Sequence, residues 1–504
     1  MSTTPVESLL AAARDALRAR DTTRAVSLCE RALRQAPASA PALHLRALIH
    51  AKSREFEATL ARARDAVASD PGQTASHHLL GVASRALGRW PDAERHYLDA
   101  LALDPRHFET LLNLGALYAQ RGRLEDAQAC YVRAAAARPA LPHAHYNLGR
   151  LSQERGDPGE AAAHYRRALE VDPGHAPAAT NLGELAQQAG ALDEAIALYR
   201  HAIEHRPGYA AAHNNLGTAL QHEGRLEDAV GQYRAATTID PRHAEAHCNL
   251  GSALVELRRD AEAQESYERV LALEPGHATA RFALSALRGE NPERAPQEHV
   301  RSLFDDYAPN FDAHIEQRLE YPTPGLIAER LAALPEVPFG TALDLGCGTG
   351  LLGAALAPFV RAIDGIDLSG GMLAQARTKG CYRELAEADI GEFLARLAPE
   401  CYDLVAAADV FIYIGALGAV FADTARVLRP GGWFAFSVES PAGENESASG
   451  YALQPTGRYA HRAAYLEGLL RRHGLATHSC DEVVLRKQSN PPVSGQLWLV
   501  RKPA

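Results

Sequence analysis

A period of 34 residues constrains the first half of this chain more than any other feature of the sequence. Eight prolines stand at this interval, and seven equal intervals are not a chance arrangement. Proline ends a helix, because its ring and its missing N–H cannot continue the hydrogen-bonding pattern. The period therefore predicts a helical unit repeated eight times. The prolines are Pro37, Pro71, Pro105, Pro139, Pro173, Pro207, Pro241 and Pro275.

Glycine and tyrosine recur in the same register. Small residues allow two antiparallel helices to cross closely, and the tyrosine ring fills the space between neighbouring helix pairs. One unit cannot bury its own apolar face, so the units are expected to stack into an all-α solenoid. The glycines are Gly81, Gly115, Gly149, Gly183, Gly217 and Gly251, and the tyrosines are Tyr97, Tyr131, Tyr165, Tyr199, Tyr233 and Tyr267.

This pattern resembles the tetratricopeptide repeat (TPR), with eight copies over residues 6–277 and a closing helix over residues 278–288. The first two copies depart from the pattern, because Cys29 and Ala63 stand at the tyrosine position. The resemblance implies a module that binds proteins or peptides and does not itself catalyse a reaction.

Asparagine also recurs, one residue before the Leu of each Leu-Gly pair. In the repeat family this position faces the concave groove, and a 34-residue step would align the amides in a ladder that binds an extended peptide through both donor and acceptor. Alternatively, the asparagine is the residue that the family favours there, and it helps one repeat to pack on the next. The residues are Asn113, Asn147, Asn181, Asn215 and Asn249.

The histidines of the repeats predict no metal site. His77, His213 and His247 share one repeat position, with His143 and His145 nearby in the sequence. Equivalent positions in successive repeats lie too far apart to share one ion, and the sequence has no His-Glu-x-x-His motif. We therefore interpret these histidines as structural or surface residues.

The repeat register stops at residues 289–300, GENPERAPQEHV, which predict a linker. This divides the chain into a repeat domain, residues 1–288, and a second domain, residues 301–504. In the second domain short apolar segments alternate with helical ones, which predicts an α/β, doubly wound, largely parallel sheet. Strands are expected at 341–345, 363–368, 402–410, 433–439, 483–486 and 495–501, and helices at 351–358, from 369 and at 415–428.

The first predicted strand of this domain ends in a glycine-rich turn that has two interpretations. Gly348 to Gly353 fit G-x-G-x-x-G, the dinucleotide fingerprint, which alone is a weak match. However, Asp344 precedes the first glycine by two residues. A carboxylate there would repel a pyrophosphate, which prefers bare N–H groups, but suits a ligand that carries an ammonium and a sulfonium.

The run Asp344-Leu-Gly-Cys-Gly-Thr-Gly350 resembles the first motif of the class I S-adenosylmethionine-dependent methyltransferases, which have a Rossmann-like fold. The later motifs follow in the family's order. The resemblance implies S-adenosylmethionine as the cofactor, with Asp367 accepting from both ribose hydroxyls, Met372 against the adenine, and Asp389-Ile390 as the adenine-binding pair. The implied cofactor-binding residues are Asp344, Gly346, Gly348, Gly350, Asp367, Leu368, Met372, Asp389, Ile390, Asp409 and Tyr307.

The whole chain resembles the bacterial TPR methyltransferases. An entry segment, residues 304–312, carries Tyr307 and Phe311, which are expected to close over the cofactor. Methyl transfer needs a general base only when the acceptor must lose a proton. The candidates are Asp409, Tyr459 and His461, and each has a structural alternative: a helix cap for Asp409 and a packing pair for the other two.

Three functions are compatible with these motifs. The first is a methyltransferase whose repeats recruit a protein substrate or partner. The second is a small-molecule methyltransferase that its repeats only localise. The third is a scaffold with a relict methyltransferase domain, which the intact run of acids argues against. The sequence does not identify the methyl acceptor.

Composition and charge argue against several other classes of protein. The net charge of −10 lacks the positive excess of a nucleic-acid-binding protein. No apolar run is long enough to span a membrane, and the N-terminus lacks the features of a secretory signal. The seven scattered cysteines, with no Cys-x-x-Cys, are typical of reduced thiols. We therefore expect a cytoplasmic protein.

Overall fold

The computed structural model describes residues 5–308, 311–314, 321–441, 449–486 and 492–504, without the side chains of residues 306, 307, 313 and 314. The chain forms two compact units, and each is described by itself. Unit 1 holds residues 1–185 and 197–207, and unit 2 holds residues 186–196 and 208–504.

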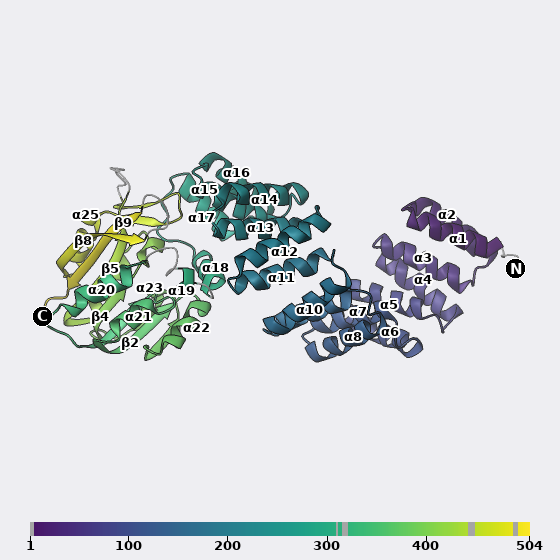
Figure 1. Ribbon diagram of the computed structural model, residues 1–504, viewed down its shortest axis with the longest axis horizontal. Helices are drawn as coiled ribbons and strands as arrows, with labels where there is room; N and C mark the ends of the chain where they lie inside the picture. Colours follow the sequence, from purple (N-terminus) through teal and green to yellow (C-terminus); the bar gives the residue numbers. More distant parts are fainter. Residues whose placement is uncertain (1–4, 309–310, 315–320, 442–448, 487–491) are drawn as a thin grey trace. The chain divides into compact units, whose positions relative to one another are not determined.

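The predicted repeats are confirmed as a series of helix pairs with a closing helix (Figure 1). The first helices of the pairs are α1 (Pro5–Arg18), α3 (Ala40–Lys52), α5 (Thr74–Ala86), α7 (Phe108–Gln120), α9 (His143–Glu154), α11 (Ala176–Gln188), α13 (Ala210–His222) and α15 (Ala244–Glu256). The second helices are α2 (Thr22–Gln35), α4 (Phe56–Ser69), α6 (Trp90–Leu103), α8 (Leu124–Ala137), α10 (Pro158–Val171), α12 (Leu192–His205), α14 (Leu226–Ile239) and α16 (Asp260–Leu273), and α17 (Ala278–Leu287) closes the series.

Each recurring glycine lies directly against the recurring tyrosine of its own repeat. A Cβ atom on Gly217 would come within 2.6 Å of Cε1 of Tyr233, and Gly149 meets Tyr165 at the same distance. Both tyrosines are about 1% exposed or less. The two periodic residues therefore contact each other. The tyrosine ring fills the space that the absent glycine side chain leaves, and this allows close packing where the two helices cross.

Residues 289–300, the predicted linker, contact the C-terminal domain through several hydrogen bonds. The carbonyl of Glu293 accepts from the backbone N–H groups of Gly415 and Ala416, both at 2.8 Å. The side chain of Asn291 donates to the carbonyl of Tyr451 at 2.9 Å. Because these backbone groups are satisfied by the domain, the segment is held in place along its length.

Over its described residues, the C-terminal domain forms a nine-stranded sheet with helices on both faces. Its helices are α18 (Gln297–Tyr307), α19 (Phe311–His314), α20 (Thr323–Ala332), α21 (Leu351–Leu356), α22 (Gly370–Lys379), α23 (Ile390–Arg396), η3 (Phe411–Tyr413), α24 (Gly418–Val427) and α25 (Ala463–Arg472). Its strands are β1 (Phe339–Leu345), β2 (Val360–Asp367), β3 (Glu384–Glu387), β4 (Tyr402–Ala407), β5 (Leu428–Glu439), β6 (Tyr451–Leu453), β7 (Tyr459–His461), β8 (Ala476–Arg486) and β9 (Val493–Arg501).

The strand order confirms a doubly wound sheet. Strands β3, β2, β1, β4 and β5 are adjacent and parallel, so their carboxyl ends meet at one edge. Strand β9 continues the sheet antiparallel to β5, and β8 pairs with β9. The sequence analysis missed a short hairpin, β6 and β7, which joins the sheet where Glu439 of β5 pairs with Ala460. Three residues per strand give too little alternation to recognise in sequence.

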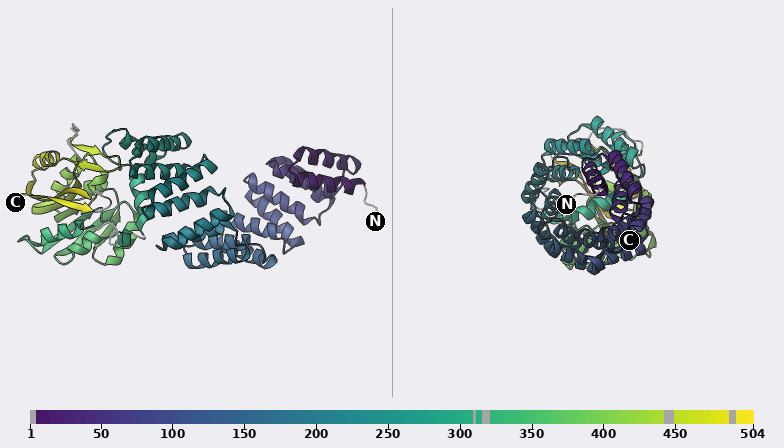
Figure 2. Two further views of the ribbon diagram at one scale, coloured as in Figure 1. Left: turned by 45° about the horizontal axis from the view of Figure 1, so that its top comes forward. Right: turned by 90° about the vertical axis from the view of Figure 1, so that its right-hand side faces the viewer.

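Two apolar cores lie on the two faces of the sheet. Side chains of α23, α24 and α25 pack on one face, and side chains of α20 and α21 pack on the other. A third cluster joins α17 to the β6–β7 hairpin through Phe282, Tyr451 and Tyr459. The last repeats and the C-terminal domain are therefore continuous within unit 2, as the ribbon views also show (Figure 2).

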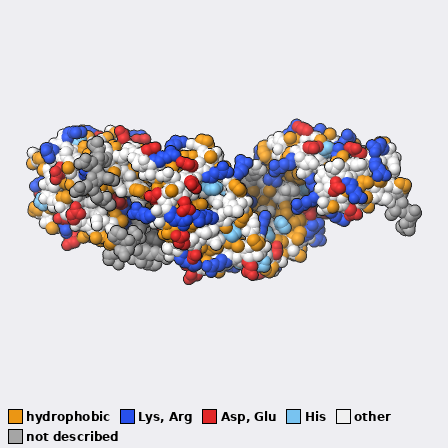
Figure 3. Space-filling view, turned by 90° about the horizontal axis from the view of Figure 1, so that it is seen from above, with side chains coloured by type: hydrophobic (Ala, Val, Ile, Leu, Met, Phe, Trp, Pro, Cys, Tyr) orange, Lys and Arg blue, Asp and Glu red, His pale blue; other side chains and the backbone are white. Residues whose placement is uncertain are grey.

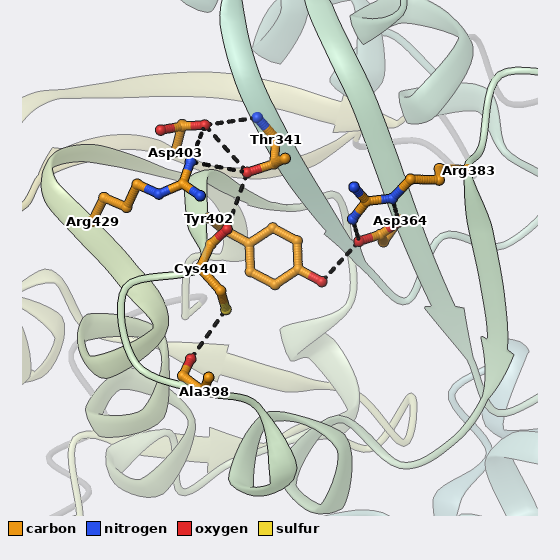
Figure 4. Close-up of polar contacts among 8 residues, drawn as sticks. All are labelled: Thr341, Asp364, Arg383, Ala398, Cys401, Tyr402, Asp403 and Arg429. Atoms are coloured by element: carbon orange, nitrogen blue, oxygen red, sulfur yellow. Dashed lines mark hydrogen bonds and ion pairs between the residues drawn. The ribbon is translucent and has the colours of Figure 1, made fainter.

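Two ion pairs between partly exposed arginines and strand-borne aspartates fix the central strands to one another (Figure 4). Asp403 of β4 pairs with Arg429 at 2.7 Å and accepts from a backbone N–H of β1 at 2.7 Å. Asp364 of β2, only 4% exposed, pairs with Arg383 at 2.9 Å and accepts from the hydroxyl of Tyr402 at 2.9 Å. These contacts cross between strands and hold the parallel register that brings the strand ends together.

Surface charge is mixed on the face seen in Figure 3, where basic and acidic side chains are interspersed over both the repeats and the C-terminal domain. In the part of the chain that the structure describes, no helix has the length and apolar character needed to cross a membrane.

The glycine–tyrosine contact predicts opposite effects for two glycine substitutions in one repeat. Gly217→Ala places a Cβ against Tyr233, whereas Gly231→Ala on α14 meets nothing within 4 Å. The first should destabilise by about 1–3 kcal/mol, and the second should stabilise by about 0.5–1 kcal/mol, because alanine restricts the unfolded chain. Urea unfolding followed by circular dichroism measures both, and equal effects would contradict the contact.

Candidate active site

The glycine-rich turn lies at the carboxyl end of β1, where its backbone takes left-handed conformations. Gly346, Gly348 and Gly350 have φ values of 64°, 54° and 89°, which disfavour any other residue, and Gly350 caps α21. A Cβ on Gly346 would come within 2.7 Å of Val410, whereas one on Gly348 would enter open space. The turn therefore presents bare backbone toward that space.

Asp344 lies beneath this turn and is 1% exposed. The hydroxyl of Tyr382 donates to its carboxylate at 2.7 Å. Burial raises the pKa of Asp344 to about 7, and the charge of Asp367 acts in the same direction. The present partner of this acid is thus Tyr382, and its contact with a cofactor remains a prediction.

Asp367 ends β2 and connects the turn to the next helix. Its carboxylate accepts from the backbone N–H of Gly348 at 2.9 Å and from that of Ser369 at 2.9 Å. Burial raises the pKa of Asp367, and the backbone donors oppose that rise. Met372, one turn into α22, is 1% exposed and lies inside the domain, and Leu368 accepts from Arg301 of α18 through its carbonyl.

Asp389 has structural partners on both of its oxygens. One oxygen accepts from the backbone N–H groups of Gly391 and Glu392, so Asp389 is the N-cap of α23, directly before Ile390. The other is bonded to the guanidinium of Arg294. Burial alone would raise the pKa of Asp389, but Arg294 and the backbone donors outweigh it and lower that pKa. Its adenine-binding role stays a prediction.

The entry segment contacts the turn through two acids that the sequence analysis did not single out. Asp305 of α18 accepts from the hydroxyl of Ser369 at 2.5 Å and from the N–H of Gly371 at 3.2 Å. Asp312 of α19 accepts from the hydroxyl of Thr349 and pairs with Lys379 at 2.5 Å. The sequence did contain a signal for these contacts, because the entry segment carries acidic residues beside its aromatic ones. The side chain of Tyr307 lies outside the described residues.

Asp409 is held in a buried charged cluster. Its carboxylate pairs with Arg486 at 2.9 Å and accepts from Ser437 at 2.8 Å, and Arg486 also bonds Glu439. Asp409 has a φ of 54°, a strained value for a residue with a side chain. Burial raises its pKa, and Arg486 opposes the rise. A carboxylate already paired with a guanidinium is a poor general base, so the structure argues against that role.

Tyr459 and His461 lie in β7 and are fully buried, which supports the packing pair over the catalytic alternative. The Tyr459 hydroxyl donates to the carbonyl of Pro292 at 2.8 Å. Nε2 of His461 lies 3.0 Å and 3.1 Å from the carbonyls of Ile414 and Gly415. Burial lowers the pKa of His461 to about 4. Neither side chain is open to a methyl acceptor in this structure.

Known families match both halves of the chain. The family described as a methyltransferase domain matches residues 343–436. Families described as tetratricopeptide repeats match six segments between residues 76 and 277. The repeats and the sheet thus define a tetratricopeptide-repeat protein with a methyltransferase domain.

Individual relatives are named as methyltransferases. The ubiquinone biosynthesis O-methyltransferase of Burkholderia cenocepacia is 34% identical over 100 residues, which are 19% of this chain and 43% of that enzyme, so less than half its length is spanned. Methyltransferase-like protein 27 of Homo sapiens is 32% identical over 189 residues, which are 36% of this chain and 71% of that protein. The chain belongs to the methyltransferase family. Among solved structures, the APC/C hetero-tetramer Cut9-Hcn1 is similar, with a TM-score of 0.42, 17% identity and 55% of each chain covered.

The buried carboxyl of Asp344 predicts a pH dependence of stability. Its folded pKa of about 7 lies above the usual 3.8, so the folded state binds this proton more tightly. The domain should therefore lose up to roughly 4 kcal/mol of stability from this group as the pH rises from about 4 through 7. Asp344→Asn cannot titrate, retains an oxygen for Tyr382, and should flatten that part of the profile.

Tryptophan fluorescence during thermal unfolding measures this difference. Of the three tryptophans, Trp433 and Trp498 lie in the C-terminal domain. Both proteins should therefore carry Trp90→Phe, which removes the signal from the repeats. Parallel curves of Tm against pH for the two proteins would contradict the raised pKa.

Proposed function

We propose that this protein is an S-adenosylmethionine-dependent methyltransferase of class I whose repeats recruit a protein, either as the methyl acceptor or as a partner. The observation that carries the proposal is the bond from Gly348 to Asp367, which joins the turn after β1 to the acid that ends β2. These two elements meet at the carboxyl edge of the parallel sheet, where ligands of doubly wound domains bind.

The residues at this edge fit the proposed cofactor. Asp367 presents a carboxylate whose present donors are backbone N–H groups, so it is suited to accept from a ribose diol. The space before Gly348 admits a ligand close to the backbone. Asp305 adds negative charge beside the turn, which favours a cationic ligand over a pyrophosphate, whereas the charge of Asp312 is balanced by Lys379. The cofactor would supply the methyl group on a sulfonium, and the chain's own residues would orient it and exclude water.

The charged cluster behind Asp409 limits the chemistry of the acceptor. Asp409 is paired with Arg486, and His461 is fully buried, which lowers its pKa, so neither serves as a general base as it stands. Among the described residues, these contacts favour an acceptor that becomes nucleophilic without a strong protein base. The domain would then act by positioning the acceptor.

Asparagines of the repeats divide into two groups by their contacts. Asn181 donates to the hydroxyl of Tyr165 at 3.0 Å, and Asn249 donates to Asn214 at 3.1 Å, so these two amides serve the packing of neighbouring repeats. Asn113 and Asn147 are half-buried and have no such bond among the described residues. The packing interpretation is thus supported at Asn181 and Asn249, and the amides of Asn113 and Asn147 are available to a peptide. We assign peptide capture to Asn113 and Asn147.

Cofactor binding is tested by Asp367→Ala in the full chain. Loss of a charge-assisted contact to two hydroxyls should weaken S-adenosylmethionine binding by about 1.5–3 kcal/mol in calorimetry. Asp481→Ala is the matched control: it removes another strand-borne acid, which lies in β8 and pairs with Arg330, so affinity should persist in the folded variant. Equal losses in both variants, or tight binding of NAD, would overturn the cofactor assignment.

Recruitment is tested by the double variant Asn113→Ala, Asn147→Ala. Each hydrogen bond contributes roughly 0.5–1.5 kcal/mol, so capture of a methyl-accepting protein should fall by about tenfold, with helicity and cofactor affinity unchanged. Asn181→Ala is the control, which should lower stability and leave capture intact.

Labelled-methyl transfer in a lysate of the host, resolved by gel and by solvent extraction, identifies the acceptor class. Label on a protein band that weakens in the double variant supports recruitment. Label only in the extract supports the small-molecule alternative.

A further inference from the structure

Two histidines and an aspartate of unit 1 converge between helices α5 and α6. His77 lies on α5, and His96 and Asp99 lie three residues apart on one face of α6. Both imidazole side chains are 13% exposed, and the Asp99 side chain is 47% exposed. The three groups thus form a cluster of donors in which the aspartate is the member most exposed to solvent.

The distances between the donor atoms are close to those between the ligand atoms of a metal site. Nδ1 of His77 lies 4.0 Å from a carboxylate oxygen of Asp99, and Nδ1 of His96 lies 3.7 Å from the same oxygen. All three ligand atoms lie within 4.8 Å of one another. Tetrahedral zinc with bonds of about 2.0–2.1 Å needs roughly 3.3 Å between ligand atoms, so small side-chain rotations would close the site.

The hydrogen bonds leave the two ligand nitrogens available. Nε2 of His77 lies 3.0 Å from the carbonyl of Pro71, which fixes the proton on Nε2 and points the Nδ1 lone pair at the cluster. A second hydrogen bond of this kind typically orients a ligand histidine. Nδ1 of His77 and Nδ1 of His96 are both buried without a hydrogen-bond partner among the described residues. Burial lowers the pKa of His96, which favours its neutral, metal-binding form.

We propose that His77, His96 and Asp99 bind one divalent transition-metal ion of the zinc class, with the fourth position open to water or to a donor from a bound partner. The ion would join α5 to α6 and so stabilise the third repeat. Two imidazoles and a carboxylate suit Zn²⁺ and not Mg²⁺ or Ca²⁺, which prefer oxygen ligands. This proposal differs from the prediction of no metal site, which compared histidines only at equivalent positions of different repeats.

The chain contains its own comparison for this site. Two repeats further on, His145, His164 and Arg167 occupy the equivalent positions, so the carboxylate is replaced by a cation. The His145 and His164 rings are stacked with centroids 6.3 Å apart, and Nδ1 of His145 is also buried without a partner among the described residues. The aspartate therefore distinguishes the third repeat from the fifth.

Metal binding is tested with untagged full-length protein stripped by chelation. One equivalent of Co²⁺ should bind and give the visible d–d absorption of a tetrahedral site. Zn²⁺ should displace the Co²⁺. No thiolate-to-metal charge-transfer band should appear, because the site has no cysteine. His96→Gln should abolish the absorption, and Asp99→Asn, which preserves shape, should weaken Zn²⁺ binding at least tenfold. His145→Gln is the matched control and should retain the full signal.

A gain of function completes the test. Arg167→Asp rebuilds the missing ligand at the second histidine pair and should raise the stoichiometry from one ion to two. Circular dichroism establishes that every variant is folded. Absence of Co²⁺ absorption in the folded parent protein, or full absorption in folded His96→Gln or Asp99→Asn, would overturn the proposal.

Discussion

The repeats depend on one steric contact, the closure of a tyrosine ring over a glycine of the same helix pair. The ring carbons lie where a Cβ atom would otherwise stand, as at Gly149 and Tyr165. The packing needs both residues. A larger side chain at the glycine position would separate the helices, and a smaller side chain at the tyrosine position would leave a void. The contact recurs at each 34-residue step, so the two helices cross in a similar way in each repeat that carries it. The recurring asparagine and histidine positions follow the same step.

The C-terminal domain depends on a different constraint, the common edge at which parallel strands end. Asp367 and the glycine turn belong to neighbouring strands and meet there through a backbone hydrogen bond. The segment of residues 289–300 reaches the same edge, because Arg294 bonds the acid that caps α23. The predicted linker therefore contacts the methyltransferase domain at several points.

Polar residues at equivalent repeat positions have different functions in this chain. Asn181 bonds a tyrosine hydroxyl of the preceding repeat, whereas Asn113 has no hydrogen bond among the described residues. Likewise His213 bonds Gln232 at 2.8 Å, whereas His77, at the same repeat position, faces His96 and Asp99. The difference lies in the residue that the neighbouring helix supplies. A repeat position therefore acquires a function only through its partner.

The sequence by itself determined the repeat architecture, the doubly wound class and the glycine turn, because periodicity and motif order are local properties of the chain. It also placed Asp344 and Asp367 correctly at strand ends, which follow from the alternation of strands and helices. Only the tertiary structure decided what each side chain contacts. It paired Asp409 with Arg486, buried His461 against carbonyls, and joined His77 to His96. Such contacts join residues that are distant in sequence or lie on neighbouring helices, so no local pattern encodes them.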